Sequence, residues 1–156
     1  MSAEENSYNL INLNNNNKIN ADDKSSMPYN LEAEQSFLGA ILFDNTTIEN
    51  IMDFIKDYHL YEPLHQEIYQ ACLILFDNNK LADPTTLKGY LRDKNPNRKI
   101  DISDYLNKLK GSVLSISNIN SYANEIKNCY LRRCLIRISE DIKENSLNIK
   151  IDTSPE

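Results

Sequence analysis

The 156-residue sequence contains only three glycines, five prolines and no tryptophan. Folds made of many short strands need frequent turns, and turns depend heavily on glycine and proline. The glycines, Gly39, Gly89 and Gly111, are also too few and too far apart to build the glycine-rich loop that holds phosphates in nucleotide-binding sites. These shortages favour long helices and argue against ATP binding within this sequence.

Residues for disulfide or metal chemistry are also few. The three cysteines, Cys72, Cys129 and Cys134, include no Cys-x-x-Cys pair, which disfavours a disulfide framework and a zinc site. His59 and His65 stand six positions apart, whereas two metal ligands on one helix face are typically four apart. We expect reduced, buried thiols, structural or surface histidines, and no metal or cofactor in this chain.

Long apolar runs and an excess of positive charge are missing as well. No run reaches the roughly 18 residues of a transmembrane helix, and the N-terminus lacks the basic and apolar regions of a secretory signal. We therefore expect a cytoplasmic protein without membrane contact. The formal net charge is −6, whereas proteins that bind DNA mainly through its phosphates are usually basic. Binding of a protein partner fits this charge better.

The one basic cluster comprises Lys127, Arg132, Arg133 and Arg137. Long arginine stems often cover apolar surface on a helix, which predicts a strip that faces solvent or a partner. Direct contact with nucleic acid is the second interpretation, although the sequence shows no exposed aromatic residues placed among the cations. Both interpretations stay open from the sequence.

Helix signals follow one another from Asn30 onward. Residues 1–27 are rich in asparagine and too polar to form a buried face, so we predict a disordered tail. Apolar residues beyond the tail recur at spacings of three and four, as in amphipathic helices. Helices are predicted to begin near Asn30, Thr46, Glu62, Asp83, Asp101 and Ser117. Thr46 and Glu49 are predicted to form a capping box, and Asp101 or Ser103 to cap the fifth helix.

The segment PYNLEAEQSFLGAILFDN contains two glutamates and a glycine that require explanation. Glu32 and Glu34 lie two positions apart on a helix and therefore point in different directions, which argues against a catalytic acid pair. We assign both to the first helical turn, where the helix dipole favours negative charge. Gly39 costs about 1 kcal/mol of helix propensity relative to alanine, so we expect it to permit close approach of another helix.

The last helix is predicted to run to about residue 145, or roughly 40 Å. Its apolar residues form two faces, so it needs a second partner, either a neighbouring helix or another subunit. Together with the fifth helix it is predicted to form a hairpin that projects from a four-helix body and mediates a dimer. The predicted dimer contacts are Tyr105, Leu106, Leu109, Ile119, Tyr122, Ala123, Ile126 and Tyr130.

Several motifs in order resemble the N-terminal domain of bacterial replicative DNA helicases, the DnaB family. The opening run P-Y-N-L-E-A-E-Q-S-F-L-G is similar to the family signature P-x-N-x-E-A-E-x-x-x-L-G. Later matches are Y-E-P-L-H-Q-E-I-Y, D-P-T-T-L and N-I-x-x-Y-A-x-x-I followed by L-R-R. The residues that carry the signature are Asn30, Glu32, Glu34, Leu38, Gly39, Tyr61, His65, Ile68 and Leu87.

The resemblance implies an all-α fold with a globular bundle of about four helices followed by a long helical hairpin. It further implies that the hairpins pair, giving a trimer of dimers in a hexameric ring that binds the helicase-binding domain of primase. A helicase loader and single-stranded DNA would be partners of the full-length ring. ATP hydrolysis, with ATP and magnesium, would belong to a RecA-like C-terminal motor domain that this sequence lacks. Such a protein would act at the replication fork in the nucleoid.

On this interpretation the sequence divides into four parts. A tail covers residues 1–27, a helical body 28–100, the dimerisation hairpin 101–146 and the start of a linker 147–156. Two alternatives stay open: the helicase-binding C-terminal domain of a primase, which shares the fold, or a non-enzymatic helical DNA-binding or adaptor protein. The position of the signature near the N-terminus argues against the first, and the net charge of −6 argues against the second.

Overall fold

The computed structural model describes residues 27–94, 101–113 and 118–148, and these residues contain helices but no strand. The elements are α1 (Leu31–Phe43), α2 (Thr47–Ile51), the 3₁₀ helix η1 (Asp57–His59), α3 (Pro63–Asp77), α4 (Pro84–Lys94), α5 (Ile102–Gly111) and α6 (Ile119–Asn148). The all-α class is therefore confirmed. Most of the predicted tail and of the predicted linker lies outside the described residues, as does the predicted boundary at residue 100.

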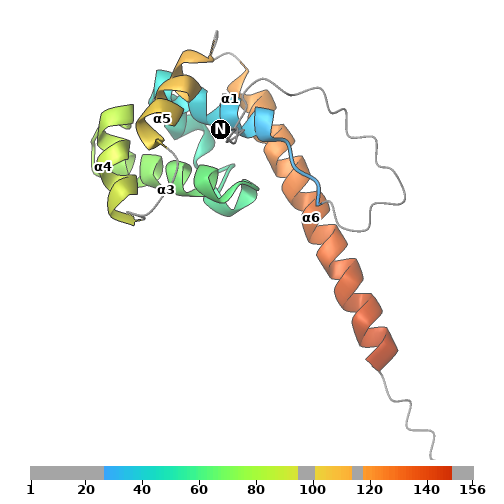
Figure 1. Cartoon of the computed structure of the whole chain (residues 1–156). Helices are drawn as coiled ribbons and strands as arrows, with labels where there is room; N and C mark the ends of the chain where they lie inside the picture. Colours follow the sequence, from blue (N-terminus) through green and yellow to red (C-terminus); the bar gives the residue numbers. More distant parts are fainter. Residues whose placement is uncertain (1–26, 95–100, 114–117, 149–156) are drawn as a thin grey trace, which may run out of the picture.

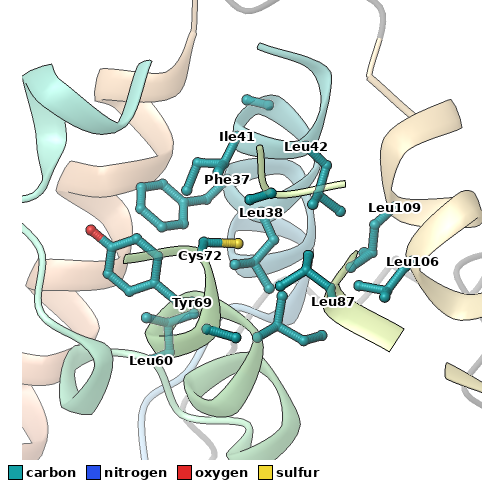
Figure 2. Close-up of a cluster of buried hydrophobic side chains, with 14 of the residues drawn as sticks. Phe37, Leu38, Ile41, Leu42, Leu60, Tyr69, Cys72, Leu87, Leu106 and Leu109 are labelled. Carbon is teal, nitrogen blue, oxygen red and sulfur yellow. The ribbon is translucent and has the colours of Figure 1, made fainter. Parts of the chain in front are cut away.

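Helix α1 lies at the centre of the body and packs against α3, α5 and α6 (Figure 1). Eight of its thirteen residues are buried, so it is enclosed on most sides rather than amphipathic. The surrounding helices complete one apolar cluster, which includes Phe37, Leu38, Ile41, Leu42, Leu60, Tyr69, Cys72, Leu87, Leu106 and Leu109 (Figure 2). Burial also raises the pKa of the Cys72 thiol to about 12, which keeps it protonated and unreactive.

Two of the predicted helix caps are confirmed and one is wrong. The Asn30 side chain accepts the N–H of Ala33 at 3.0 Å, and Asp101 accepts two N–H groups at the start of α5. Thr46 has helical backbone angles and makes no capping bond. Asp44 organises this turn instead, because its carboxylate accepts the Thr46 hydroxyl at 2.7 Å and the Thr46 N–H at 3.0 Å. These hydrogen bonds lower the pKa of the Asp44 carboxyl.

Helix α6 differs between its two halves. Ile119, Ala123, Ile126 and Cys129 are buried in the first half, where α6 packs against α1. From residue 135 onward every described residue is exposed except the half-buried Ile136. The second half extends away from the body (Figure 1), and we call the segment 134–148 the arm.

The fifth helix, which the sequence placed in a hairpin with the sixth, packs within the body in the described residues. Helix α5 packs against α1 and α4, and α6 packs against α1, so α5 belongs to the body. Six of the eight predicted dimer contacts are consequently core residues of this chain, namely Tyr105, Leu106, Leu109, Ile119, Ala123 and Ile126. Tyr122 and Tyr130 are half-buried. Apolar periodicity marks a face that needs covering, but it does not tell whether the cover comes from α1 or from another subunit.

Candidate functional site

The arm of α6 carries exposed apolar side chains on one side. Leu131, Leu135, Ile138 and Ile142 are between 49% and 66% exposed. Their spacing of four, three and four places them in one row along the helix. We call this row, which begins one turn before the arm, the arm stripe. Because exposed contiguous apolar surface marks interaction sites, the arm stripe is the candidate contact for a partner.

The arm stripe is not a continuation of the body's core. At 3.6 residues per turn it lies on the side of α6 away from Ile126 and Arg133, which face the body. The same side of the first half of α6 carries Asn120, Asn124 and Asn128, all exposed. The outer side of α6 therefore changes from polar to apolar at Leu131, where the helix leaves the body.

Arg133 lies inside the protein at the base of the arm, and not on the surface strip that the sequence suggested. Its side chain is only 4% exposed. Nη1 donates to the carbonyl oxygen of Pro28 at 2.8 Å, and Nη2 donates to that of His59 at 2.7 Å. The guanidinium carbon also lies 5.5 Å from the ring centre of Tyr61 and 5.8 Å from that of Tyr130.

The rest of the basic cluster is divided between intramolecular contacts and solvent. Lys127 Nζ donates to the carbonyl oxygen of Phe54 at 2.9 Å and lies 4.2 Å from the centre of that ring. Arg132 and Arg137 are exposed. With Arg133 buried and Lys127 engaged, the four cations do not form a continuous surface for phosphates, which weakens the nucleic-acid interpretation.

A buried polar network joins α1, α3 and α5. His65 Nδ1 lies 2.7 Å from Glu34 Oε2, and His65 Nε2 lies 2.6 Å from the Tyr105 hydroxyl. The second oxygen of Glu34 accepts the N–H of Tyr61 at 2.5 Å, and Glu62 N–H donates to Oε2 at 3.3 Å. Glu34 is 2% exposed. The carboxylate therefore ties the end of the η1 loop to the body core.

The two signature glutamates consequently have different roles. Glu32 is exposed in the first turn of α1, as the dipole interpretation predicts. Glu34 is a buried hydrogen-bond acceptor, which the sequence interpretation missed. Its partner His65 is 31 positions away, and no local pattern links the two; only their joint presence in the family signature pointed to a relation.

The remaining signature residues serve mainly the core. Leu38, Ile68 and Leu87 are fully buried. Gly39 faces α5 so closely that an added Cβ would lie 2.5 Å from the carbonyl oxygen of Leu109, which confirms the predicted close approach of another helix. Asn30 caps α1. Tyr61 donates its N–H to Glu34, and its ring lies beside Arg133.

His59 is held in its neutral form next to Arg133. The N–H of Lys56 donates to His59 Nδ1 at 3.1 Å, so this nitrogen carries no proton and accepts the bond. Burial lowers the pKa of His59, and the nearby positive charges of Lys127, Lys56 and Arg133 lower it further. Protonation would break the bond from Lys56 and add a cation beside three others.

We therefore expect acid to destabilise the domain through His59. A histidine whose folded pKa is lowered binds its proton more readily when unfolded, so its contribution is complete above the unfolded pKa of about 6.5 and decreases as the pH falls through it. Urea unfolding at pH 7.5 and 5.5 measures the loss, and His59→Asn is the comparison. The variant is expected to lose less stability between these pH values than the wild type. An equal loss in both proteins would contradict this role.

The described residues offer little for chemistry or for membrane insertion. They contain no group of three or more histidine, cysteine, aspartate or glutamate side chains that could hold a metal ion. Within the same ranges no helix is long and apolar enough to cross a membrane. The buried polar side chains among the described residues bond to one another or to the main chain.

Comparison with known sequences identifies the family. The model of the DnaB-like helicase N-terminal domain matches residues 26–128. The replicative DNA helicase DnaB of Rickettsia prowazekii is 34% identical over 136 residues, which cover 85% of this chain and 28% of the relative. The DnaB of Pasteurella multocida is 33% identical over 123 residues, covering 79% of this chain and 26% of the relative. The chain thus spans less than a third of the length of these relatives.

Solved structures show the same fold. The N-terminal domain of DnaB helicase from Mycobacterium tuberculosis has a TM-score of 0.73 and 28% identity, covering 78% of this chain and 87% of that one. The N-terminal domain of the Helicobacter pylori DnaB helicase, described together with its interactions with primase, has a TM-score of 0.64 and 21% identity. That match covers 74% of this chain and 90% of the other. With its family signature in the body core and around the base of α6, the chain belongs to the DnaB-like helicase N-terminal domain family.

Proposed function

We propose that this chain is the N-terminal oligomerisation and primase-interaction domain of an ATP-dependent replicative DNA helicase. Family membership supports the proposal, because the full-length relatives are named replicative DNA helicases. ATP hydrolysis with magnesium would take place in a motor domain outside this sequence. The complete protein would form a hexameric ring at the replication fork in the cytoplasm, and the helicase loader and single-stranded DNA would be partners of that ring.

The arm stripe is the observation that carries the oligomerisation role. Each leucine or isoleucine side chain contributes about 1.5–3 kcal/mol when it moves from water into an apolar contact. A two-fold pair of arms would bury eight such side chains. The free energy gained by burying them is at least comparable to the cost of association, which is about 4–15 kcal/mol. The stripe therefore replaces the buried residues of α5 and of the first half of α6 as the proposed subunit contact.

The primase role rests on the family and on a structural likeness. The N-terminal domain from Helicobacter pylori and a DnaB-like replicative helicase, both of this fold, are described with their interactions with primase. We propose that this domain likewise binds the helicase-binding domain of its cognate primase. The exposed surface of the body and arm offers the area for such a contact, since the interior is occupied by the apolar core.

Sedimentation velocity tests both roles in one experiment. The domain at about 10–100 µM is expected to form dimers or larger assemblies, and addition of the primase fragment is expected to give a faster species. Leu135→Glu should shift the domain toward monomer, because it places a charge within the stripe. The matched control Asn124→Glu adds the same charge to the outer side of α6 above the stripe and should leave assembly unchanged.

Each role has its own contradicting result. A strictly monomeric wild-type domain would refute the oligomerisation role, because it would show that a second copy does not cover the stripe. Absence of any new species with the primase fragment would remove the primase role without affecting the first conclusion.

A further inference from the structure

Arg133 marks the point where α6 leaves the body. Ile126 and Cys129, two turns and one turn earlier, are buried against the body, whereas the described residues from 135 onward are exposed or, for Ile136, half-buried. Arg133 is therefore the last buried side chain of α6 in the described part of the chain. The arm, which begins directly after Arg133, extends away from the body (Figure 1).

The partners of Arg133 come from two separate segments. Pro28 precedes the cap of α1, and His59 ends the 3₁₀ helix η1. The two hydrogen bonds that Arg133 donates therefore join α6 to the segment before α1 and to η1. The planar guanidinium donates in fixed directions, and satisfying both carbonyl oxygens at 2.7–2.8 Å leaves it little rotational freedom. One side chain thus fixes α6 against two independent points.

A third point is provided by Tyr61. Its ring lies beside the guanidinium, and its N–H donates to the buried Glu34 carboxylate. Glu34 is bound in turn to His65, which lies against Tyr105 of α5. The surroundings of Arg133 are therefore connected by hydrogen bonds to three helices of the body, and they do not form a mobile surface loop.

A buried cation is an expensive way to fill this position. In the described part of the chain Arg133 bonds to main-chain oxygens and to no carboxylate, so its charge is not neutralised by an ion pair. Burying a charge costs several kcal/mol, and an apolar side chain of similar length often stabilises a fold as well or better. What an apolar side chain cannot do is specify direction, because its contacts are not directional.

We infer that Arg133 is the positioning residue of the arm: its guanidinium fixes the direction of α6 and so presents the arm stripe in one orientation. The fixed direction follows from the contacts described above. Its importance for assembly rests on the proposed oligomerisation function. An arm that samples many directions would present a competent stripe in only a fraction of molecules, and the apparent dissociation constant would rise by the inverse of that fraction.

Pulsed electron–electron double resonance measures the distance between two spin labels, and so reports the arm direction independently of assembly. Spin labels at the exposed positions Lys88 on α4 and Glu144 on the arm, with Cys134 replaced by serine, report a body-to-arm distance. Labelled protein is diluted with unlabelled protein so that only distances within one chain are recorded. The wild type is expected to give one narrow distance. Arg133→Gln should give a broad distribution, because the amide cannot reach both carbonyl oxygens with two charged donors.

Arg132→Gln is the matched control, since it removes the same charge from the neighbouring, exposed position. It should keep the narrow distance. Arg133→Lys retains the charge without the planar pair of donors, so we expect an intermediate width. This milder variant also serves if Arg133→Gln does not fold, which circular dichroism will show. A narrow, unshifted distance in every folded Arg133 variant would overturn the inference, even if thermal stability falls.

Sedimentation of the same variants separates the inference from the proposed function. If the competent orientation falls to a tenth of the molecules, self-association should weaken about tenfold per arm in Arg133→Gln and not in Arg132→Gln. A monomeric wild type with a narrow distance that broadens in Arg133→Gln would refute the oligomerisation role while supporting the positioning role. If the distance is broadened in Arg133→Gln but both variants assemble equally strongly, the link between arm direction and assembly is refuted.

Discussion

Replacement of Glu34 by alanine is expected to lower the free energy of unfolding by about 3–5 kcal/mol, the usual cost of removing one member of a buried, hydrogen-bonded pair. The substitution leaves His65 and two main-chain N–H groups, those of Tyr61 and Glu62, without their acceptor. His65 is buried and the two N–H groups are partly buried, so these donors lose a protein partner and regain little water in exchange. Urea unfolding monitored by circular dichroism measures the loss.

Glu32→Ala is the matched control for this prediction. Glu32 is exposed in the same helical turn, so its removal costs only the small favourable interaction with the helix dipole, about 0.3–1 kcal/mol. Glu34→Gln should fall between the two, because the amide oxygen still accepts one bond but carries no charge. Equal effects of the two alanine substitutions would show that the Glu34 network contributes nothing beyond the dipole.

Replacement of Gly39 by leucine is expected to destabilise the body by about 3 kcal/mol or more, at the upper end of the cost of overpacking. A Cβ at this position would lie 2.5 Å from the carbonyl oxygen of Leu109 and 2.6 Å from a methyl group of Val113. The first of these is main chain, which moves only if α5 itself shifts. Thermal unfolding should therefore show a clear decrease in Tm.

The chain offers a control of opposite sign at Gly89. Apart from its chain neighbours and the adjacent backbone of α4, no atom of the described residues lies within 4 Å of a Cβ built there, and the residue is exposed in α4. Gly89→Ala is expected to raise stability by about 0.5–1 kcal/mol, because alanine is the better helix former and restricts the unfolded chain. Unchanged or higher stability in Gly39→Leu would refute the close packing of α1 against α5.

Local rules account for most of the secondary structure that the sequence predicted. The caps Asn30 and Asp101 and the proline at the start of α3 act within one helical turn, so their neighbours in sequence determine the outcome. The same reasoning failed at Thr46, where the adjacent Asp44 competes for the capping role and accepts both donors of Thr46. Helix α2 has only five residues, so its apolar pattern is too short to show whether Asp44 or Thr46 organises its start.

Tertiary placement was harder to predict because it depends on contacts between distant residues. The periodicity of α5 and α6 correctly identified their apolar faces, but α1 covers both, which the faces alone do not reveal. The sequence explained Glu34 by the helix dipole and placed Arg133 on a strip facing solvent or a partner, and neither interpretation includes burial. The most distant partner in sequence is 31 positions away for Glu34 and 105 positions away for Arg133. A buried charge is recognisable only when such partners are known.

The arm also has mechanical consequences. About 22 Å of helix extend from Arg133 to Asn148, so α6 acts as a lever whose fulcrum is the guanidinium. A rotation of about 10° at the fulcrum displaces the tip by about 4 Å, close to the rise of nearly three helical residues. Small adjustments among Pro28, His59 and Tyr61 would thus become large movements at the far end, in the direction of whatever follows in the chain.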